Sequence, residues 1–261
     1  MSGAAATGFA DHFSRDSASY AAFRPRYPAA LFEWLATLPA TRRIVWDVAT
    51  GSGQAATMLV PHFERVLASD ASPAQLRARS RVPGVHYFAD RSDAAALATG
   101  RVDLVTVAQA YHWFDHPRFH AEVDRVLVPG GAFAAWCYGS LVVGPDIEEA
   151  FARFYDGTVG AYWPPERIHV ERGYRHFPIP IAEVAAPPMR IVTALSLAQL
   201  LGYVRTWSAV GRYMKANGHD PVPTFGEELR ALWGDPARPK EMFWPISVRA
   251  GRWLGSGASE A

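Results

Sequence analysis

The sequence predicts an α/β fold built on a doubly wound, mostly parallel sheet. Short apolar runs alternate with helical patterns along residues 43–138, and this alternation is typical of parallel strands joined by right-handed crossovers. One unit, Trp46–Gln54, is an apolar run that ends in an acid and passes through a tight glycine turn into a helix. Asp70 ends the next apolar run, 19 residues after Gly51. An acid at this distance from a glycine loop is typical of the cofactor-binding edge of such a sheet.

Local signals place the elements in chain order. A helix is expected over 28–38, because Pro28 precedes an apolar stripe with helical spacing. Ser72–Pro73 and His116–Pro117 indicate two further helix starts, since proline is favoured in the first turn of a helix. Strands are predicted near 43–48, 65–70, 85–88, 102–107 and 131–138, and helices near 54–61, 73–80 and 117–127.

The chain changes character after Tyr138, where residues 139–190 carry many prolines and aromatic residues. We interpret this stretch as a mainly helical insertion that builds a substrate pocket over the carboxyl edge of the sheet; the alternative is a structural cap that does not touch substrate. Helices are expected near 146–156 and 165–174, a helix pair or a bent helix over 196–216, and a terminal strand over 241–251. The expected organisation is a cofactor-binding core with an N-terminal flap over 1–138, a substrate cap over 139–190, the completion of the core over 191–254 and a mobile tail over 255–261.

Composition excludes several classes of function. The 261 residues include 26 basic and 25 acidic side chains, so we expect no nucleic-acid partner and no anionic membrane partner.

The single cysteine, Cys137, lies in an apolar run and is expected to be buried and reduced. Neither a signal-peptide pattern nor a run of 18 apolar residues is present. We therefore expect a cytoplasmic protein. The sequence leaves the oligomeric state open between a monomer and a homodimer.

Asp70 and the glycine loop predict an adenosine site. A carboxylate accepts hydrogen bonds from both hydroxyls of a ribose; the alternative is that Asp70 caps the helix near Pro73, although Ser72 is the better candidate for that cap. Two cofactors fit. Residues 51–56 match G-x-G-x-x-A, which is typical of NAD sites. Asp47 favours S-adenosylmethionine, because a carboxylate beside the loop repels a pyrophosphate but tolerates a sulfonium and an ammonium group.

Three motifs carry a family resemblance. Asp47–Gly53, Val102–Phe114 and Arg125–Gly131 resemble the first motif, the fourth strand with its loop, and the turn before strand five of class I S-adenosylmethionine-dependent methyltransferases. Tyr20 and residues 23–28 resemble the N-terminal segment of the trans-aconitate-type small-molecule subgroup (methyltransferase type 11). The resemblance implies a Rossmann-like, seven-stranded sheet with an antiparallel terminal strand beside strand five. It also implies S-adenosylmethionine as cofactor and a small-molecule acceptor.

The same resemblance implies roles for individual residues. Tyr20, Arg24 and Tyr27 belong to a flap that closes over the cofactor, where the fork of an arginine suits a carboxylate; the alternative is a surface arginine and packed tyrosines. Ser92 and Asp93 are expected at the adenine, with Asp90 as the alternative in a longer loop. The implied cofactor contacts are Tyr20, Arg24, Asp47, Ala49, Gly51, Gly53, Asp70, Ala71, Ser92, Asp93, Gln109 and Ala110, of which the last two adjoin the methionine part. Ala49 replaces the usual glycine, and because alanine disfavours positive φ we expect altered loop detail there.

His112 is the candidate catalytic residue, because it follows a strand at the predicted active edge and histidine is a common general base. The alternative is a packed histidine that orients the loop. The candidate acceptor contacts are Tyr27, His112, Trp113, Tyr138, Trp163 and Trp207, and the alternative is that these aromatic residues form core. No metal site is expected, because Pro117 starts the helix and so takes His112 out of line with His116 and His120.

The chemistry predicts an in-line methyl transfer that depends on orientation. A carboxylate acceptor needs no base, whereas a hydroxyl or an amine needs one, so O-, N- and C-methylation remain open. Two alternative functions also remain open: an NAD(P)-dependent oxidoreductase, and a non-catalytic S-adenosylmethionine-binding protein.

Overall fold

The computed structural model describes residues 25–77 and 82–257. Tyr20, Arg24 and most of the expected flap lie outside the described residues, and the helix expected over 73–80 is described only as far as Arg77.

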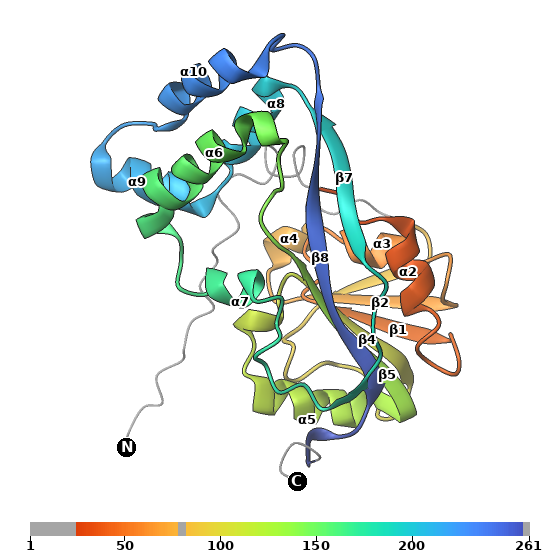
Figure 1. Cartoon of the computed structure of the whole chain (residues 1–261). Helices are drawn as coiled ribbons and strands as arrows, with labels where there is room; N and C mark the ends of the chain where they lie inside the picture. The colour runs from red at the N-terminus through yellow and green to blue at the C-terminus, as the bar shows by residue number, and fades with distance from the viewer. Residues whose placement is uncertain (1–24, 78–81, 258–261) are drawn as a thin grey trace, which may run out of the picture.

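Eight strands form one sheet in the described part of the chain (Figure 1). They are β1 (Ile44–Val48), β2 (Arg65–Asp70), β3 (Val85–Ala89), β4 (Val102–Ala108), β5 (Leu127–Tyr138), β6 (Ile181–Glu183), β7 (Met189–Leu195) and β8 (Lys240–Trp253). The order is β3-β2-β1-β4-β5-β8-β6, with β7 also paired to β8. The first five strands are parallel, and β8 runs antiparallel beside β5. The doubly wound fold and its antiparallel terminal strand are confirmed, but the expected count of seven strands is wrong.

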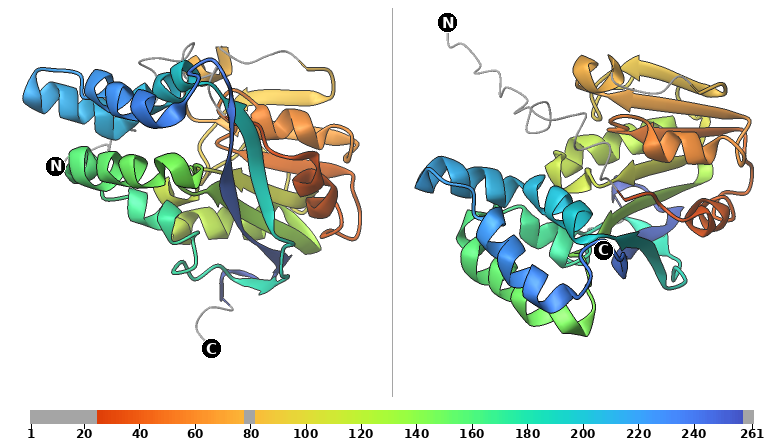
Figure 2. Two further views of the ribbon diagram at one scale, coloured as in Figure 1. Left: turned by 45° about the horizontal axis from the view of Figure 1, so that its top comes forward. Right: turned by 90° about the horizontal axis from the view of Figure 1, so that it is seen from above.

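Helices cover both faces of the parallel strands (Figures 1 and 2). These are α2 (Ala29–Leu35), α3 (Gln54–Leu59), α4 (Pro73–Arg77) and α5 (His116–Val126). Alternate residues of β5 enter two separate apolar cores: Trp136 packs in the core that contains α2 and α3, and Cys137 in the core that contains α5. Cys137 is buried, as expected, and burial raises the pKa of its thiol to about 12. A sheet buried on both faces explains why its strands are continuous apolar runs.

A group of helices stands apart from those that cover the sheet (Figure 2). It contains α6 (Pro145–Ala152), a π-helical turn η2 (Arg153–Thr158), a 3-10 turn η3 (Gly160–Tyr162), α8 (Leu197–Arg205), α9 (Ser208–Asn217) and α10 (Val222–Trp233). We call this group the helical cap. Helix α10 packs against α6 and α8, and α9 packs against η3. The cap is therefore built from two separate stretches of chain, 145–162 and 197–233, which the long strands β7 and β8 connect to the sheet (Figure 1).

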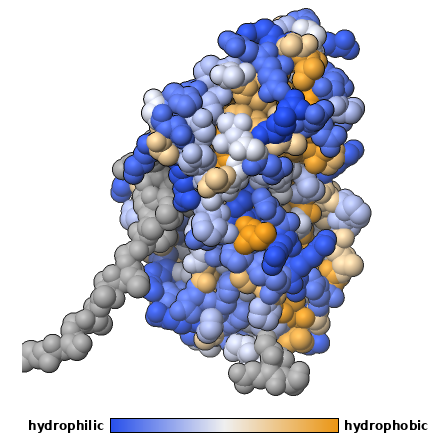
Figure 3. All heavy atoms as spheres, turned by 60° about the vertical axis from the view of Figure 1, so that its left-hand side comes forward, coloured by the Kyte–Doolittle hydropathy of each residue, from blue (hydrophilic) through white to orange (hydrophobic). Residues whose placement is uncertain are grey.

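The face in Figure 3 is mainly hydrophilic, with hydrophobic residues in small separate groups. None of the helices described is long and apolar enough to cross a membrane. A hollow of about 450 Å³, lined in part by Arg43, Arg65 and Arg101, lies at the amino ends of β1, β2 and β4. This is the edge of the sheet opposite the glycine loop, so the hollow is not part of the site that the motifs predict.

Candidate functional site

The strand order reverses between β1 and β4, and ligands of open α/β sheets bind beyond the carboxyl ends of the strands at this point. Asp47 on β1 lies opposite Thr106 on β4. Its carboxylate accepts hydrogen bonds from Thr106 Oγ1 (2.9 Å), Thr50 Oγ1 (2.6 Å) and the backbone N–H of Ala56. Burial raises the pKa of Asp47 to about 6, these hydrogen bonds oppose the rise, and the charge of Asp70 adds to it. Asp47 thus anchors the glycine loop and the first turn of α3 from beneath.

The glycine loop contains three residues with positive φ: Ala49 (52°), Gly51 (58°) and Gly53 (84°). Alanine disfavours positive φ, yet Ala49 itself adopts the left-handed conformation in this loop. Gly53 has a second constraint. A Cβ at this position would lie 2.1 Å from the hydroxyl oxygen of Tyr87, so only glycine fits.

Asp70 joins the glycine loop to the turn that follows β2. Its Oδ2 accepts from the backbone N–H of Gly51 (2.8 Å) and its Oδ1 from that of Ser72 (2.8 Å). Ser72 Oγ accepts from Gln75 N–H (3.4 Å) and so caps α4 itself. Each carboxylate oxygen has two lone pairs and can accept more than one hydrogen bond, so these two contacts are compatible with a role in binding ribose hydroxyls. Ala71 follows directly and is exposed.

The loop after β3 brings Asp90 next to Asp70, since the backbone N–H of Asp90 donates to the Asp70 carbonyl (3.2 Å). Asp93 forms ion pairs with Arg91 (2.8 Å) and Arg118 (3.1 Å). The hydrogen bond from Arg91 lowers the pKa of the Asp93 carboxyl, although burial opposes this effect. Ser92 is half-buried between them. Asp90 therefore lies beside the carboxyl end of β2, whereas the carboxylate of Asp93 is paired with two arginines.

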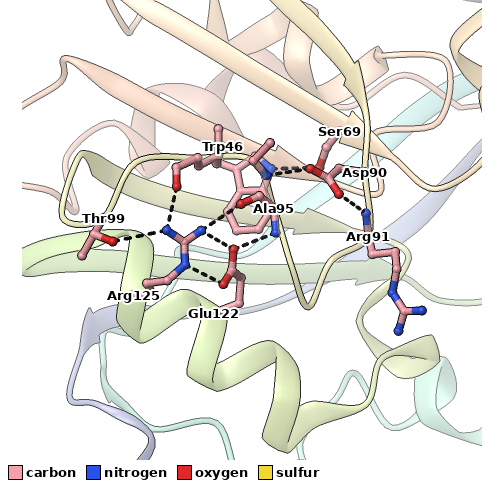
Figure 4. Close-up of polar contacts among 10 residues, drawn as sticks. Trp46, Ser69, Asp90, Arg91, Ala95, Thr99, Glu122 and Arg125 are labelled. Carbon is pink, nitrogen blue, oxygen red and sulfur yellow. Dashed lines mark hydrogen bonds and ion pairs between the residues drawn. The ribbon is translucent and has the colours of Figure 1, made fainter.

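Helix α5 fixes the remainder of this loop (Figure 4). Glu122 Oε1 accepts from Ala95 N–H (2.7 Å), and Arg125 donates to the carbonyls of Ala95 (2.9 Å) and Leu97 (2.6 Å). Arg125 also pairs with Glu122 (2.5 Å). The segment that follows the candidate adenine contacts is thus held in place by α5.

Gln109 and Trp136 present unused donors at the ends of β4 and β5. Gln109 has φ 59°, and its backbone N–H donates to the Trp136 carbonyl (2.9 Å). Gln109 Nε2 and Trp136 Nε1 are both buried and have no hydrogen-bond partner among the described residues. Buried donors are normally satisfied, so this pair fits a ligand that brings acceptor oxygens, such as the carboxylate of a methionine moiety. Ala110 follows Gln109 and is half-buried. Sequence analysis missed Trp136, because nothing distinguishes it from a core strand residue.

His112 lies in the 3-10 turn η1 (Tyr111–Trp113), directly after β4. Its Nδ1 is 2.9 Å from the hydroxyl of Tyr174, a buried residue with φ 62°. Burial lowers the pKa of His112 to about 4, and the charges of His169 and Arg167 contribute. The imidazole is therefore neutral at neutral pH. The role of Tyr174 was not predicted.

Arg167 is the centre of a polar cluster near His112. It lies on α7 (Arg167–Glu171), and its charge acts on both His112 and Cys137. It donates to Tyr155 Oη (3.0 Å) and Ser140 Oγ (3.1 Å), and its guanidinium lies 5.0 Å from the ring centroid of Trp163. Arg167 Nε also forms an ion pair with Glu171 Oε1 at 3.4 Å. Arg167 was not singled out from the sequence, because no motif or spacing marks it.

The other candidate acceptor contacts divide between edge and core. Tyr27 is buried, with its ring centroid 5.8 Å from that of Trp136 and 6.2 Å from that of Tyr138. Trp113 is 40% exposed. Trp207 packs among aromatic residues inside the cap, 5.4 Å from Trp163. The structure thus brings Tyr27 and Tyr138 together beside Trp136, and it buries both Tyr27 and Trp207 in the same core.

His116 and His120 contact Tyr111 instead of forming a metal face. His116 Nε2 is 3.0 Å from the Tyr111 carbonyl, and His120 Nε2 is 2.7 Å from the Tyr111 hydroxyl. Helix α5 begins at His116, one residue before Pro117, with Asp115 as its cap. No cluster of three or more His, Cys, Asp or Glu side chains suited to a metal ion is found within residues 25–77 and 82–257.

Comparison with known proteins identifies the family. A family model described as a methyltransferase domain matches residues 46–135. A relative from Dictyostelium discoideum, whose name assigns it to the methyltransferases, is 30% identical over 227 residues, which are 85% of this chain and 86% of the relative. This chain belongs to the methyltransferase family. A solved structure from Anaeromyxobacter dehalogenans, described as a type II methyltransferase, is similar to this methyltransferase with a TM-score of 0.84 and 45% identity over 88% of this chain and 97% of that one. A Mycobacterium tuberculosis methyltransferase is 40% identical over 114 residues, which are 43% of this chain and 46% of the relative.

The family assignment decides between the functions left open by the sequence. The protein is an enzyme of the methyltransferase class, and its cofactor is S-adenosylmethionine; the oxidoreductase and the non-catalytic binding protein are set aside. The residues fit this cofactor. Asp47 and Asp70 form an acidic loop edge that would repel a pyrophosphate, and Gln109 Nε2 is an unused buried donor.

Proposed function

We propose that this methyltransferase acts on a small molecule, held at the carboxyl edge of β4 and β5. The observation that carries the proposal is the convergence of polar groups from separate segments at this edge: His112 from η1, Tyr174 and Arg167 from the insertion, and Ser140 from the loop after β5. Polar side chains gathered in an aromatic setting are typical of small-molecule sites. The resemblance of the N-terminal segment to the trans-aconitate-type subgroup supports the same conclusion.

The cofactor would lie across the switch point between β1 and β4. Asp70 would bind the ribose hydroxyls, and the glycine loop would lie under the adenosine. Asp90, or Ser92 and Asp93, would contact the adenine. The remaining proposed contacts are Asp47, Ala49, Gly51, Gly53, Ala71, Gln109 and Ala110, with Tyr20 and Arg24 in the flap.

Catalysis would depend mainly on orientation. When bound, S-adenosylmethionine supplies a methyl group made electrophilic by the sulfonium. In-line transfer requires the acceptor atom about 3–3.5 Å from that carbon. Tyr27, Tyr138 and Trp163 would position the acceptor and exclude water from the edge. Residues 139–190 would then serve as a substrate cap, in a cytoplasmic protein that is a monomer or a homodimer.

An acceptor screen tests this proposal. S-adenosylhomocysteine release is measured with a panel of small carboxylates, alcohols and amines, and separately with RNA, DNA and protein. Turnover of small molecules by the wild type, with loss of that turnover in the Asp70→Ala variant, is the expected result. Turnover confined to the macromolecules would overturn the small-molecule assignment.

A further inference from the structure

The hollow at the amino ends of β1, β2 and β4 lies at the edge of the sheet opposite the glycine loop. Its volume of about 450 Å³ falls within the range of roughly 300–1,000 Å³ that is typical of small-molecule sites. Three arginines, Arg43, Arg65 and Arg101, and one acid, Glu64, line it. The proposed cofactor and acceptor contacts include none of these residues, so the hollow is a separate feature of the molecule.

The lining of the hollow carries more positive than negative charge. Arg43 lies 3.7 Å from the buried carboxylate of Asp103, which compensates its charge. Arg65 and Arg101 form no ion pair within residues 25–77 and 82–257. Glu64 can offset only one of these two charges. Both arginines are exposed, so an anion from solution can reach them.

Hydrogen bonds fix the wall of the hollow that the strands form. Asp103 accepts from the backbone N–H groups of Arg43 (3.0 Å) and Ile44 (2.7 Å). The backbone N–H of Arg65 in turn donates to the Arg43 carbonyl (2.9 Å). The backbone from which Arg43 and Arg65 project is therefore held by the buried Asp103.

Helix α5 fixes the opposite wall, which the loop before β4 forms. Arg125 (Figure 4) donates to the Leu97 carbonyl (2.6 Å), and its own carbonyl accepts from the backbone N–H of Gly100 (2.9 Å). The backbone N–H of Arg101 donates to the Val126 carbonyl (2.9 Å). Because both walls are held by contacts within the chain, a ligand would find the hollow already formed, and little ordering would oppose its binding.

Apolar residues complete the lining: Ile44, Leu67, Leu97 and Val102. The first three are half-buried. Burial of an apolar group against such side chains favours binding. The hollow therefore offers two different environments, one of guanidinium groups and one of hydrocarbon.

We propose that this hollow is a second ligand site, which binds a phosphate monoester with a small apolar or aromatic body. Arg65 and Arg101 bind the phosphate, and the body lies against Leu67 and Leu97. A phosphate monoester has three terminal oxygens and about 1.5–2 negative charges at neutral pH, which match two guanidinium forks. A carboxylate has two oxygens and one charge, so it satisfies the two arginines less well. This site does not depend on the identity of the methyl acceptor, because that acceptor is placed at the other edge of the sheet.

Titration of phenyl phosphate into the full chain, labelled with ¹⁵N and saturated with S-adenosylhomocysteine, tests the site by nuclear magnetic resonance. Inorganic phosphate, benzoate and benzyl alcohol are the comparison probes. We expect saturable shifts in the backbone signals of residues 97–102 with phenyl phosphate. Its affinity should exceed that of each comparison probe by about tenfold or more, because only phenyl phosphate combines the dianion with a ring. Absence of saturable shifts in residues 97–102 would overturn the site, and equal affinity for benzoate would overturn its preference for phosphate.

Three variants test the charges separately. Arg65→Gln and Arg101→Gln should each weaken phenyl phosphate binding by about tenfold, since each removes a charged donor. Glu64→Gln should strengthen binding, because it removes the opposing charge. Arg230→Gln is the control: Arg230 is an exposed arginine on α10, in the helical cap, and its variant should bind phenyl phosphate as the wild type does.

Calorimetric titration of S-adenosylhomocysteine shows whether each variant is folded, and we expect the same affinity in all of them. Phenyl phosphate affinity that is unchanged in both Arg65→Gln and Arg101→Gln would overturn the proposal. An equal loss in Arg230→Gln would do so as well, because it would show attraction to the general charge of the surface. Displacement of phenyl phosphate by S-adenosylhomocysteine would place the anion at the glycine loop and would also overturn the proposal.

Discussion

Ala49 holds a backbone conformation that glycine adopts without strain. Its φ is 52°. In this left-handed conformation the Cβ lies too close to the following carbonyl oxygen, which costs about 1–2 kcal/mol. We predict that Ala49→Gly raises the free energy of unfolding by about 0.5–1 kcal/mol, because relief of this strain exceeds the added entropy of glycine in the unfolded chain. Urea denaturation measures the change. Ala36→Gly is the control: Ala36 has φ −68°, so that variant should lose stability. A less stable Ala49→Gly protein would show that the loop is not strained.

Local residues of the site were predictable, and distant ones were not. Asp47, Gly51, Gly53 and Asp70 lie within one strand–loop–helix–strand stretch, where spacing alone brings them together. Tyr174 is 62 residues from His112, and no period in the sequence links the two. The position of Arg167 depends on how residues 139–190 fold, and the sequence of this insertion indicates only that it is rich in aromatic residues.

Helix α3 depends on the glycine that precedes it. Gly53 combines φ 84° with a Cβ position 2.1 Å from Tyr87 Oη, whereas Gly100 has φ 62° and nothing within 4 Å. We predict that Gly53→Ala lowers the free energy of unfolding by about 2–4 kcal/mol, as backbone strain and overpacking add. Gly100→Ala should lose only about 1–2 kcal/mol, and it should keep its affinity for S-adenosylhomocysteine. Equal losses in the two variants, measured by urea denaturation, would refute the contact with Tyr87.

Burial explains why some strands were predictable from the sequence and others were not. Strands β1, β2, β4 and β5 are buried on both faces and appear in the sequence as apolar runs. Strands β6 and β7 were missed, because each pairs only with β8 and β7 is mostly exposed or half-buried. Helix α10 was missed, and within it Gly226 weakens the helical pattern. A Cβ at Gly226 would lie 2.8 Å from a methyl carbon of Leu201, so an alanine there would require that side chain to shift.

The stability of the whole molecule should depend on pH through its buried histidines. Burial lowers the pKa of His112 and of His120 to about 4, below the ordinary value of 6.5. A group whose pKa is lower in the folded state stabilises the fold above its unfolded pKa, and that stability is lost as pH falls. Asp47 has the opposite effect below about pH 6. Its pKa is raised on folding, so protonation of this carboxyl favours the folded state as pH falls.

We therefore predict that the free energy of unfolding decreases as pH falls from about 6.5 towards 4. Chemical denaturation at a series of pH values measures the slope. His120→Gln should flatten it, since the amide cannot take up a proton, and His219→Gln on the surface is the control. A wild-type stability that does not change between these pH values would contradict the account.

The central claim is that the edge formed by the glycine loop and Asp70 binds the adenosine of S-adenosylmethionine. Its most direct test is calorimetric titration of S-adenosylhomocysteine into the wild type, Asp70→Asn and Asp103→Asn. Asp103 anchors the opposite edge by accepting from the backbone N–H groups of Arg43 (3.0 Å) and Ile44 (2.7 Å), so its variant shares the loss of a backbone anchor. We predict micromolar binding by the wild type and by Asp103→Asn, and binding weaker by about 1.5–3 kcal/mol in Asp70→Asn. Unchanged affinity in Asp70→Asn, or binding of NADH in place of S-adenosylhomocysteine, would contradict it.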